Sequence, residues 1–159
     1  GKWVQIRRLD LPYPPIAEEC FIIGDTTIAV QINVHRVDIY NYDLDRNEFE
    51  RIQDPLQLEW SDYNRTEYQS ISFSEDYFVY SAVDWWSTKS EGVIFVYHRQ
   101  DMNHSYAFQE HINSTNYGGA LSGAISVDNG ILVSNGDNRT HVFVLDSNGY
   151  WEEALTLDK

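Results

Sequence analysis

The sequence predicts an all-β fold, a partial β-propeller with about three four-stranded antiparallel blades and one extra strand at the N-terminus. Three observations carry this prediction. A short apolar strand recurs three times along the chain, a strand hairpin precedes it each time, and a strand that begins with an aromatic residue follows it. Four short antiparallel strands in every repeat of roughly 45 to 55 residues are typical of a propeller blade.

The composition agrees with a β-rich domain. The chain has 159 residues, 42% of them hydrophobic and 14% aromatic, and tyrosine is the commonest aromatic residue with 11 copies. A chain of this length can bury a sizeable core as one domain. Tyrosine, phenylalanine and β-branched residues are enriched in strands, and no long helical periodicity is present.

The N-terminal segment predicts a strand followed by a linker. Residues 3–9 alternate imperfectly between apolar and polar side chains, so we expect residues 1–9 to form the outer strand of a blade that precedes the first complete one. Residues 10–19 contain three prolines, which exclude a helix and a central strand there.

Three hairpins supply the first two strands of the blades. They cover residues 21–30, 69–80 and 125–133, with turns at 24–26, 75–76 and 128–130. The last is the clearest, because Asn129-Gly130 strongly favours a two-residue type I′ turn.

The third strand of each blade is the recurring apolar one, at residues 37–40, 93–97 and 141–145. Residues 93–97 are apolar at every position, which indicates a strand covered on both faces. A blade between two neighbouring blades has both faces covered, whereas a two-sheet sandwich leaves one face in water and shows alternation.

The fourth strands align Trp3, Phe49, Phe108 and Trp151 in one column, and the second strands align Ile28 with Phe78 and Ile131. The blades then cover residues 20–54, 68–113 and 122–158. We expect an open array of blades, so a closed ring from this chain alone, or two packed sheets with a common core, would contradict it.

The loop and strand at residues 84–97 also carry a resemblance to a family. The run from Gly92 to Tyr97, together with Gly1-Lys2-Trp3 and Gly149-Tyr150-Trp151, resembles the FG-GAP type of repeat found in integrin-α-like β-propellers. The Phe-Gly and Gly-Ala-Pro signatures of that repeat are absent. The resemblance implies an extracellular propeller with a role in adhesion or recognition, and calcium loops in some blades.

The charge balance excludes several classes of partner. The chain has 25 acidic and 11 basic residues, a net charge of −14. Nucleic-acid binding needs a basic face, and anionic membrane surfaces also attract basic segments. No apolar run reaches the roughly 20 residues of a membrane span, so we expect no direct membrane insertion. The acidic loops either keep the protein soluble or form a surface for calcium or a polycation.

The candidate metal ligands are Asp43, Asp45 and Asn47. Their alternate spacing on a short loop is the arrangement that calcium ligands need. The alternative is an ordinary turn between two strands, since Asp and Asn are turn-forming residues. We therefore expect no obligatory cofactor, with calcium as the alternative.

The candidate ligand-binding residues lie in the loop that precedes the apolar strand. Trp85 and Trp86 could stack on a sugar ring, a peptide or a partner protein, with Asp84 and Lys89 supplying polar contacts. The alternative is that one or both indoles fill the seam between blades. No catalytic serine motif and no phosphate-binding loop is present, and the five histidines lack metal-binding spacing.

Four glycosylation sequons indicate the compartment, and each falls in or beside a predicted loop. We therefore expect a glycoprotein that is secreted or lies on the extracellular face of a membrane protein. The acceptor residues are Asn64, Asn103, Asn113 and Asn138.

These observations favour a non-catalytic recognition or adhesion module that binds protein or carbohydrate through loops on a propeller face. Two alternatives stay open, a fragment of a propeller-based carbohydrate-active enzyme and an inert structural repeat array. An open array exposes the apolar sides of its end blades, so we also expect the chain to need the remaining blades of a larger protein or self-association.

Overall fold

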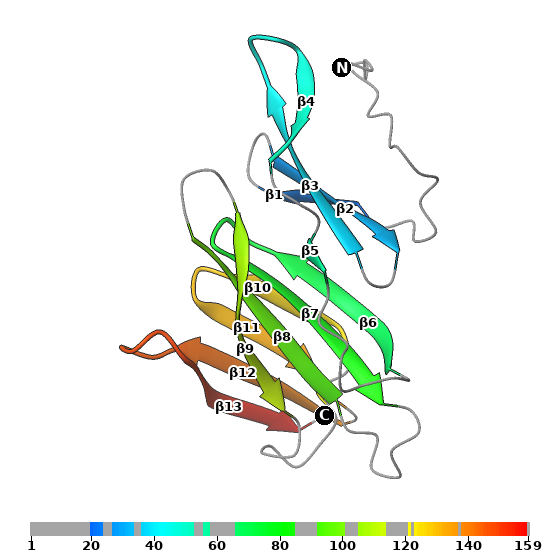
Figure 1. Ribbon diagram of the computed structural model, residues 1–159. Coiled ribbons are helices and arrows are strands. Elements are labelled where there is room, and N and C mark those ends of the chain that lie inside the picture. The colour runs from blue at the N-terminus through cyan, green and yellow to red at the C-terminus, as the bar shows by residue number, and fades with distance from the viewer. Residues whose placement is uncertain are drawn as a thin grey trace, which may run out of the picture. The chain divides into compact units, whose positions relative to one another are not determined.

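The computed structural model in Figure 1 describes most of the strands and several of the connections between them. The described residues are 20–23, 27–33, 36–52, 56–57, 66–84, 92–100, 105–113, 121, 123–136 and 138–158. Only the backbone is described for residues 20–23, 31–33, 56–57, 66–69 and 83–84. The strand predicted for residues 1–9 and the linker predicted for 10–19 lie outside this part of the chain.

The prediction of an all-β fold is confirmed, because the regular elements of the described residues are strands in three antiparallel sheets. Sheet A contains β1 (Cys20–Ile23), β2 (Thr27–Asn33), β3 (Arg36–Asp43), β4 (Glu48–Arg51) and β5 (Leu56–Gln57). Sheet B contains β6 (Thr66–Phe73), β7 (Tyr77–Asp84), β8 (Gly92–Arg99) and β9 (Tyr106–Asn113). Sheet C contains β10 (Ile125–Asp128), β11 (Ile131–Asn135), β12 (Arg139–Leu145) and β13 (Trp151–Asp158). The part of the chain that is described has no helix long and apolar enough to cross a membrane.

The chain divides into two compact units, Gly1–Glu59 with sheet A and Trp60–Lys159 with sheets B and C. In each sheet the first four strands follow one another in sequence order, as consecutive hairpins require. Sheet A differs from the prediction by the fifth strand, β5, which pairs with the beginning of β3 while β4 pairs with its end. The eight-residue β3 is long enough to hold two short partners along one side.

Sheet B contains the most deeply buried strand that the sequence predicts. Residues 92–97 of β8 are all buried, so both faces of this strand are covered. One face carries aromatic rings that stack along the sheet. The rings of Tyr80 and Phe95 lie 4.6 Å apart and almost parallel, at 7°, and Phe78 stacks on Phe73 at 4.5 Å.

The other face of sheet B packs on sheet C, and Figure 1 shows the two sheets as neighbouring layers. The shared core is almost wholly apolar, and aliphatic residues predominate. It consists of Tyr77, Val79, Ile94, Val96, Ile112, Leu121, Ile125, Val127, Leu132, Phe143 and Trp151. Burial of this apolar surface is the main force that holds the two sheets together.

Polar contacts fix the position of β10 against β6 at the inner side of this core. The backbone N–H of Val127 donates to the Ser72 hydroxyl at 3.1 Å, and that of Ile125 donates to the Ser70 hydroxyl at 3.3 Å. The two hydroxyls satisfy these two N–H donors, which lie on the side of β10 that has no strand neighbour.

Sheets B and C repeat the same irregularity. The register between β8 and β9 shifts between Val96 and Tyr97, and that between β12 and β13 shifts between Val142 and Phe143. Each shift is a β-bulge in the last pair of strands, and a bulge marks a defined position in a repeat. Superposing the two bulges makes Val142 the counterpart of Val96, and the Val133–Val142 pair the counterpart of Val79–Val96.

This relation corrects the alignment expected from sequence. Tyr106 pairs with Arg99 as Trp151 pairs with Leu145, so Tyr106 is the counterpart of Trp151. Both are buried, whereas Phe108, the residue aligned with Trp151 by sequence, is 42% exposed. The second-strand column is displaced by one residue, so Leu132 rather than Ile131 corresponds to Phe78. A slip of one residue turns a side chain to the opposite face of the sheet.

Candidate functional site

The predicted ligand-binding loop leaves sheet B between its two central strands. Asp84 is the last residue of β7, where its backbone pairs with Thr66, so the loop begins after it, and a ligand contact from Asp84 stays a prediction. Within β7 the buried hydroxyl of Ser81 donates to the Gly123 carbonyl oxygen at 3.2 Å, so this polar group is not left without a partner in the core. Trp85, Trp86 and Lys89 lie outside the described residues.

The base of this loop is firmly held. Val83 of β7 pairs with Gly92 of β8, so the two ends of the loop leave neighbouring strands. Farther into the same strands, Val79 and Val96 are fully buried in the core between sheets B and C. The described ends of the loop, Val83 and Gly92, therefore belong to strands that run into this buried core.

Two of the predicted glycan acceptors lie toward the end of the second unit at which β7 finishes and β8 begins. Asn113 ends β9, where its neighbour on β8 is Val93, and is half-buried. Asn138 is exposed in the short connection between β11 and β12. In the latter sequon the Thr140 hydroxyl donates to the Asn135 side-chain oxygen at 2.8 Å. Asn64 and Asn103 lie outside the described residues.

The candidate metal ligands occupy the turn between β3 and β4. One oxygen of the Asp43 carboxylate accepts the backbone N–H groups of Asp45 and Arg46 at 2.9 and 3.0 Å. The other lies 3.6 Å from the Arg46 guanidinium, and the Asn47 side-chain oxygen accepts the Tyr42 hydroxyl. Asn47 has a positive φ of 56°, which suits a turn.

These contacts are those of an Asx turn that closes a hairpin. Among the described residues, no group of three or more His, Cys, Asp or Glu side chains is arranged to hold a metal ion. Calcium at Asp43, Asp45 and Asn47 stays a prediction.

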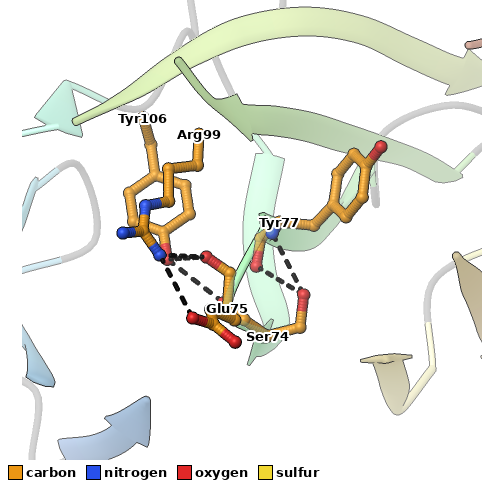
Figure 2. A network of polar contacts seen from close by, with 5 residues as sticks. All are labelled: Ser74, Glu75, Tyr77, Arg99 and Tyr106. Carbon is orange, nitrogen blue, oxygen red and sulfur yellow. Dashed lines mark hydrogen bonds and ion pairs between the residues drawn. The ribbon is translucent and has the colours of Figure 1, made fainter. Parts of the chain in front are cut away.

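A polar network closes the turn between β6 and β7 in the second unit, and Figure 2 shows its five residues. The Tyr106 hydroxyl donates to the carbonyl oxygens of Ser74 and Glu75 at 3.1 and 3.2 Å. Arg99 donates to the same Glu75 carbonyl at 3.3 Å and lies 3.7 Å from its carboxylate. The Ser74 hydroxyl accepts the backbone N–H of Tyr77 at 3.0 Å.

Burial raises the pKa of the Tyr106 phenol to about 12. The ring is nearly inaccessible to water, and the nearby Arg99 only partly offsets the desolvation. The phenol therefore stays protonated and donates to the turn at all physiological pH values. Its partners are backbone carbonyls, which assigns this network to holding the turn rather than to acid–base chemistry.

A buried ion pair in sheet A was not predicted from the sequence. Asp38 is fully buried and accepts two bonds from the Arg36 guanidinium at 2.9 and 3.0 Å, one on each carboxylate oxygen. The Tyr40 hydroxyl donates to it at 3.3 Å, and Arg51 lies 4.0 Å away. Burial, and then the negative charge of Asp38, raises the pKa of Tyr40. The alternation of Arg36, Asp38 and Tyr40 along one strand was a usable signal, since these residues share one face.

Sheet C contains a second polar cluster. His141 is 1% exposed, and its Nδ1 lies 2.6 Å from a carboxylate oxygen of Glu153, which also accepts the Thr156 hydroxyl at 2.5 Å. Burial by itself raises the pKa of Glu153, but the bonds from His141 and Thr156 outweigh it, and the net pKa is lowered. The bulge brings Glu153 to the inner face, where it faces His141, and the sequence gives no sign of that.

Comparison with known proteins adds no family to these observations, since no protein-family model and no curated protein matches the chain.

Proposed function

We propose that this chain is a non-catalytic recognition module made of stacked four-stranded repeats of the β-propeller type, which binds a protein or carbohydrate ligand through the loop between β7 and β8. The observation that supports the proposal best is the relation between the two faces that meet in the core of the second unit.

The faces of sheets B and C that meet are not equivalent. Leu132 and Phe143 on the inner face of sheet C correspond to Phe78 and Tyr97 of sheet B, because both pairs lie at the same place beside the bulge. Phe78 and Tyr97 lie on the face of sheet B that points away from sheet C. Sheet C therefore follows sheet B head to tail, the type of contact that generates rings and arrays.

A sandwich of two such sheets related by a two-fold axis would bury equivalent faces against each other. The second unit does have two sheets with a common core, an arrangement that we expected to contradict an open array. That criterion is too broad, because neighbouring blades of a propeller also share a core. The head-to-tail relation is what successive blades produce, so it supports successive blades over a two-fold sandwich.

The recognition role rests on where the loops lie. Residues 85–91 leave strands that the core fixes, and two adjacent tryptophans in such a loop offer large apolar area with few rotatable bonds. The exposed Asn138 sequon toward the same end agrees with an extracellular glycoprotein of adhesion or recognition type. Calcium in the β3–β4 turn belongs to the same proposal as an accessory.

An array of extracellular proteins and glycans, probed with the full chain, tests the recognition role. We expect at least one ligand to bind, and the Trp85→Ala/Trp86→Ala variant to lose it by more than tenfold in affinity, the effect of removing an aromatic hot spot. Tyr150→Ala is the matched control, because Tyr150 is an exposed aromatic residue of the β12–β13 turn.

Three outcomes decide the matter. A ligand that binds the wild type and Tyr150→Ala but not the double variant supports the proposal. Equal binding by all three proteins removes the tryptophans from the site. Release of reducing sugar from an arrayed glycan, lost on substitution of acidic residues, would establish the carbohydrate-active enzyme instead.

A further inference from the structure

Sheet C is coloured yellow to red in Figure 1, and its outer face is apolar and exposed. We name it the outer C face and define it by Ile131, Val133, Val142, Val144, Leu155 and Leu157, which all point away from sheet B. Ile131, Leu155 and Leu157 are 49%, 50% and 50% exposed, and Val144 is 37% exposed. Six adjoining apolar side chains on one sheet face are unusual for a surface that only meets water.

The equivalent face of sheet B shows what covers such a surface. Val133 and Val142 correspond to Val79 and Val96, and Leu157 corresponds to Ile112, since each lies at the same distance from its bulge. Val79 and Val96 are fully buried and Ile112 is 4% exposed, and what packs on them is sheet C. At these three positions the outer C face therefore repeats the apolar pattern of a face that is covered by a four-stranded sheet.

A polar feature of that interface is repeated as well. Ser72 pairs with Val79 across β6 and β7, and its hydroxyl accepts the backbone N–H of Val127 in the neighbouring sheet. Ser126 pairs with Val133 across β10 and β11, so it stands at the position of Ser72. Ser126 is exposed and ready to accept the same kind of bond from an incoming edge strand.

We infer that the outer C face is the docking surface for one further four-stranded antiparallel sheet of the same repeat type. The incoming sheet presents a face like the inner face of sheet C, with apolar residues on its two central strands and a free backbone N–H on its first strand for Ser126. This inference rests on the repeat relation of the proposed function and is independent of the ligand bound by the loop.

A second copy of the whole chain fits this surface less well. The complementary face of sheet C is already covered by sheet B within each copy, so a second copy cannot offer that face. Each copy also has a net charge of −14, which opposes close association of two of them.

The repeat relation fixes the design of a test. Asp158 corresponds to Asn113, the last residue of sheet B before the connection to sheet C. An extended chain with residues 1–158 followed directly by a second copy of residues 114–159 therefore gives the added sheet the natural connection. Hydrogen exchange of the β13 amides in the first copy reports docking, because a packed sheet opens less often than one with a bare face.

We expect the β13 amides to exchange about tenfold more slowly in the extended chain than in the original one. Leu155→Gln in the first copy should abolish this gain. Leu44→Gln, at a leucine 73% exposed in the turn after β3, should preserve it. Neither substitution changes the charge. Unchanged exchange of β13 in the extended chain, or an added copy that exchanges like an unfolded segment, overturns the inference.

The original chain supplies a second measurement that does not depend on folding of an added sheet. An apolar fluorescent dye should bind the chain, and a Leu155→Gln/Leu157→Gln variant should bind at least severalfold less, whereas Leu44→Gln should bind normally. Equal dye binding by all three overturns the claim that the face is open. A dimer in sedimentation that Leu155→Gln dissociates would make a second copy the occupant and overturn the further sheet. Loss of ligand binding through the tryptophans leaves all these readouts unchanged.

Discussion

Replacing Tyr106 with phenylalanine tests whether β9 holds the β6–β7 turn closed across sheet B. The ring stays, including its edge contact with Phe73 at 6.2 Å between ring centroids, and only the hydroxyl is lost. That hydroxyl is the donor for the carbonyls of Ser74 and Glu75, and the Glu75 carbonyl keeps the bond from Arg99. One net hydrogen bond and one poorly solvated carbonyl together cost about 1–2 kcal/mol of unfolding free energy.

Urea unfolding followed by tryptophan fluorescence measures this loss, with the midpoint compared at constant slope. Tyr150→Phe is the control, because Tyr150 is 58% exposed and its substitution should change the unfolding free energy by less than about 0.5 kcal/mol. If Tyr106→Phe proves as stable as Tyr150→Phe, the network in Figure 2 does not support the turn and the reasoning fails.

The same variant makes a prediction about alkaline pH. Burial raises the pKa of Tyr106 from 10.0 to about 12, so the folded state holds the phenolic proton more tightly than the unfolded state does. The stabilisation is complete below pH 10 and is lost as the pH rises toward 12. Wild-type stability should therefore fall more steeply over this interval than that of Tyr106→Phe. Parallel curves for the two proteins would contradict this assignment.

Three further substitutions probe the second unit. Glu110→Gln should raise the unfolding free energy at pH 7 and leave it unchanged at pH 3, because burial raises the pKa of this carboxyl. Glutamine still accepts the backbone N–H of Trp151, which donates to Glu110 at 3.2 Å. Glu153→Gln should cost about 1 kcal/mol at pH 7 by weakening charge-assisted bonds. Because the pKa of Glu153 is lowered, that contribution is present above pH 4.5 and lost in acid. Gly123→Ala should cost about 2–3 kcal/mol, since a Cβ there would lie 2.3 Å from the Asn135 carbonyl oxygen.

Urea unfolding at pH 3 and pH 7 checks the two glutamate variants, and thermal melting at pH 7 checks the glycine variant. Glu152→Gln, at an exposed position beside Glu153, is the control for the effect of removing one negative charge. Ala124→Ser, at the exposed residue after Gly123, is the control for substitution in that segment. A destabilised Glu110→Gln, or a Gly123→Ala protein that melts with the wild type, would refute the corresponding argument.

Local chemistry in the sequence determined where several strands lie and how one hairpin turns. The Asn129-Gly130 turn is present with positive φ at both residues, 47° and 73°, because few other residue pairs adopt that conformation without strain. The unbroken apolar run in β8 also predicted correctly that both faces of this strand are buried. Each of these features depends on residues that are neighbours in the chain, so a single sequence suffices to predict them.

The tertiary structure alone decided which side chains face the core beyond each bulge. A bulge adds one residue to a strand and reverses the face of everything after it, and no local pattern marks its place. Tyr106 and Phe108 lie on the same face of β9, and Tyr106 takes the buried position that the sequence assigned to Phe108 because the pairing with Arg99 places it against the β6–β7 turn. At the β12–β13 bulge, Glu153 turns inward to His141 although glutamate is normally a surface residue. The head-to-tail relation of sheets B and C, and with it the meaning of the outer C face, depends on pairings between residues far apart in the chain, which only the folded chain fixes.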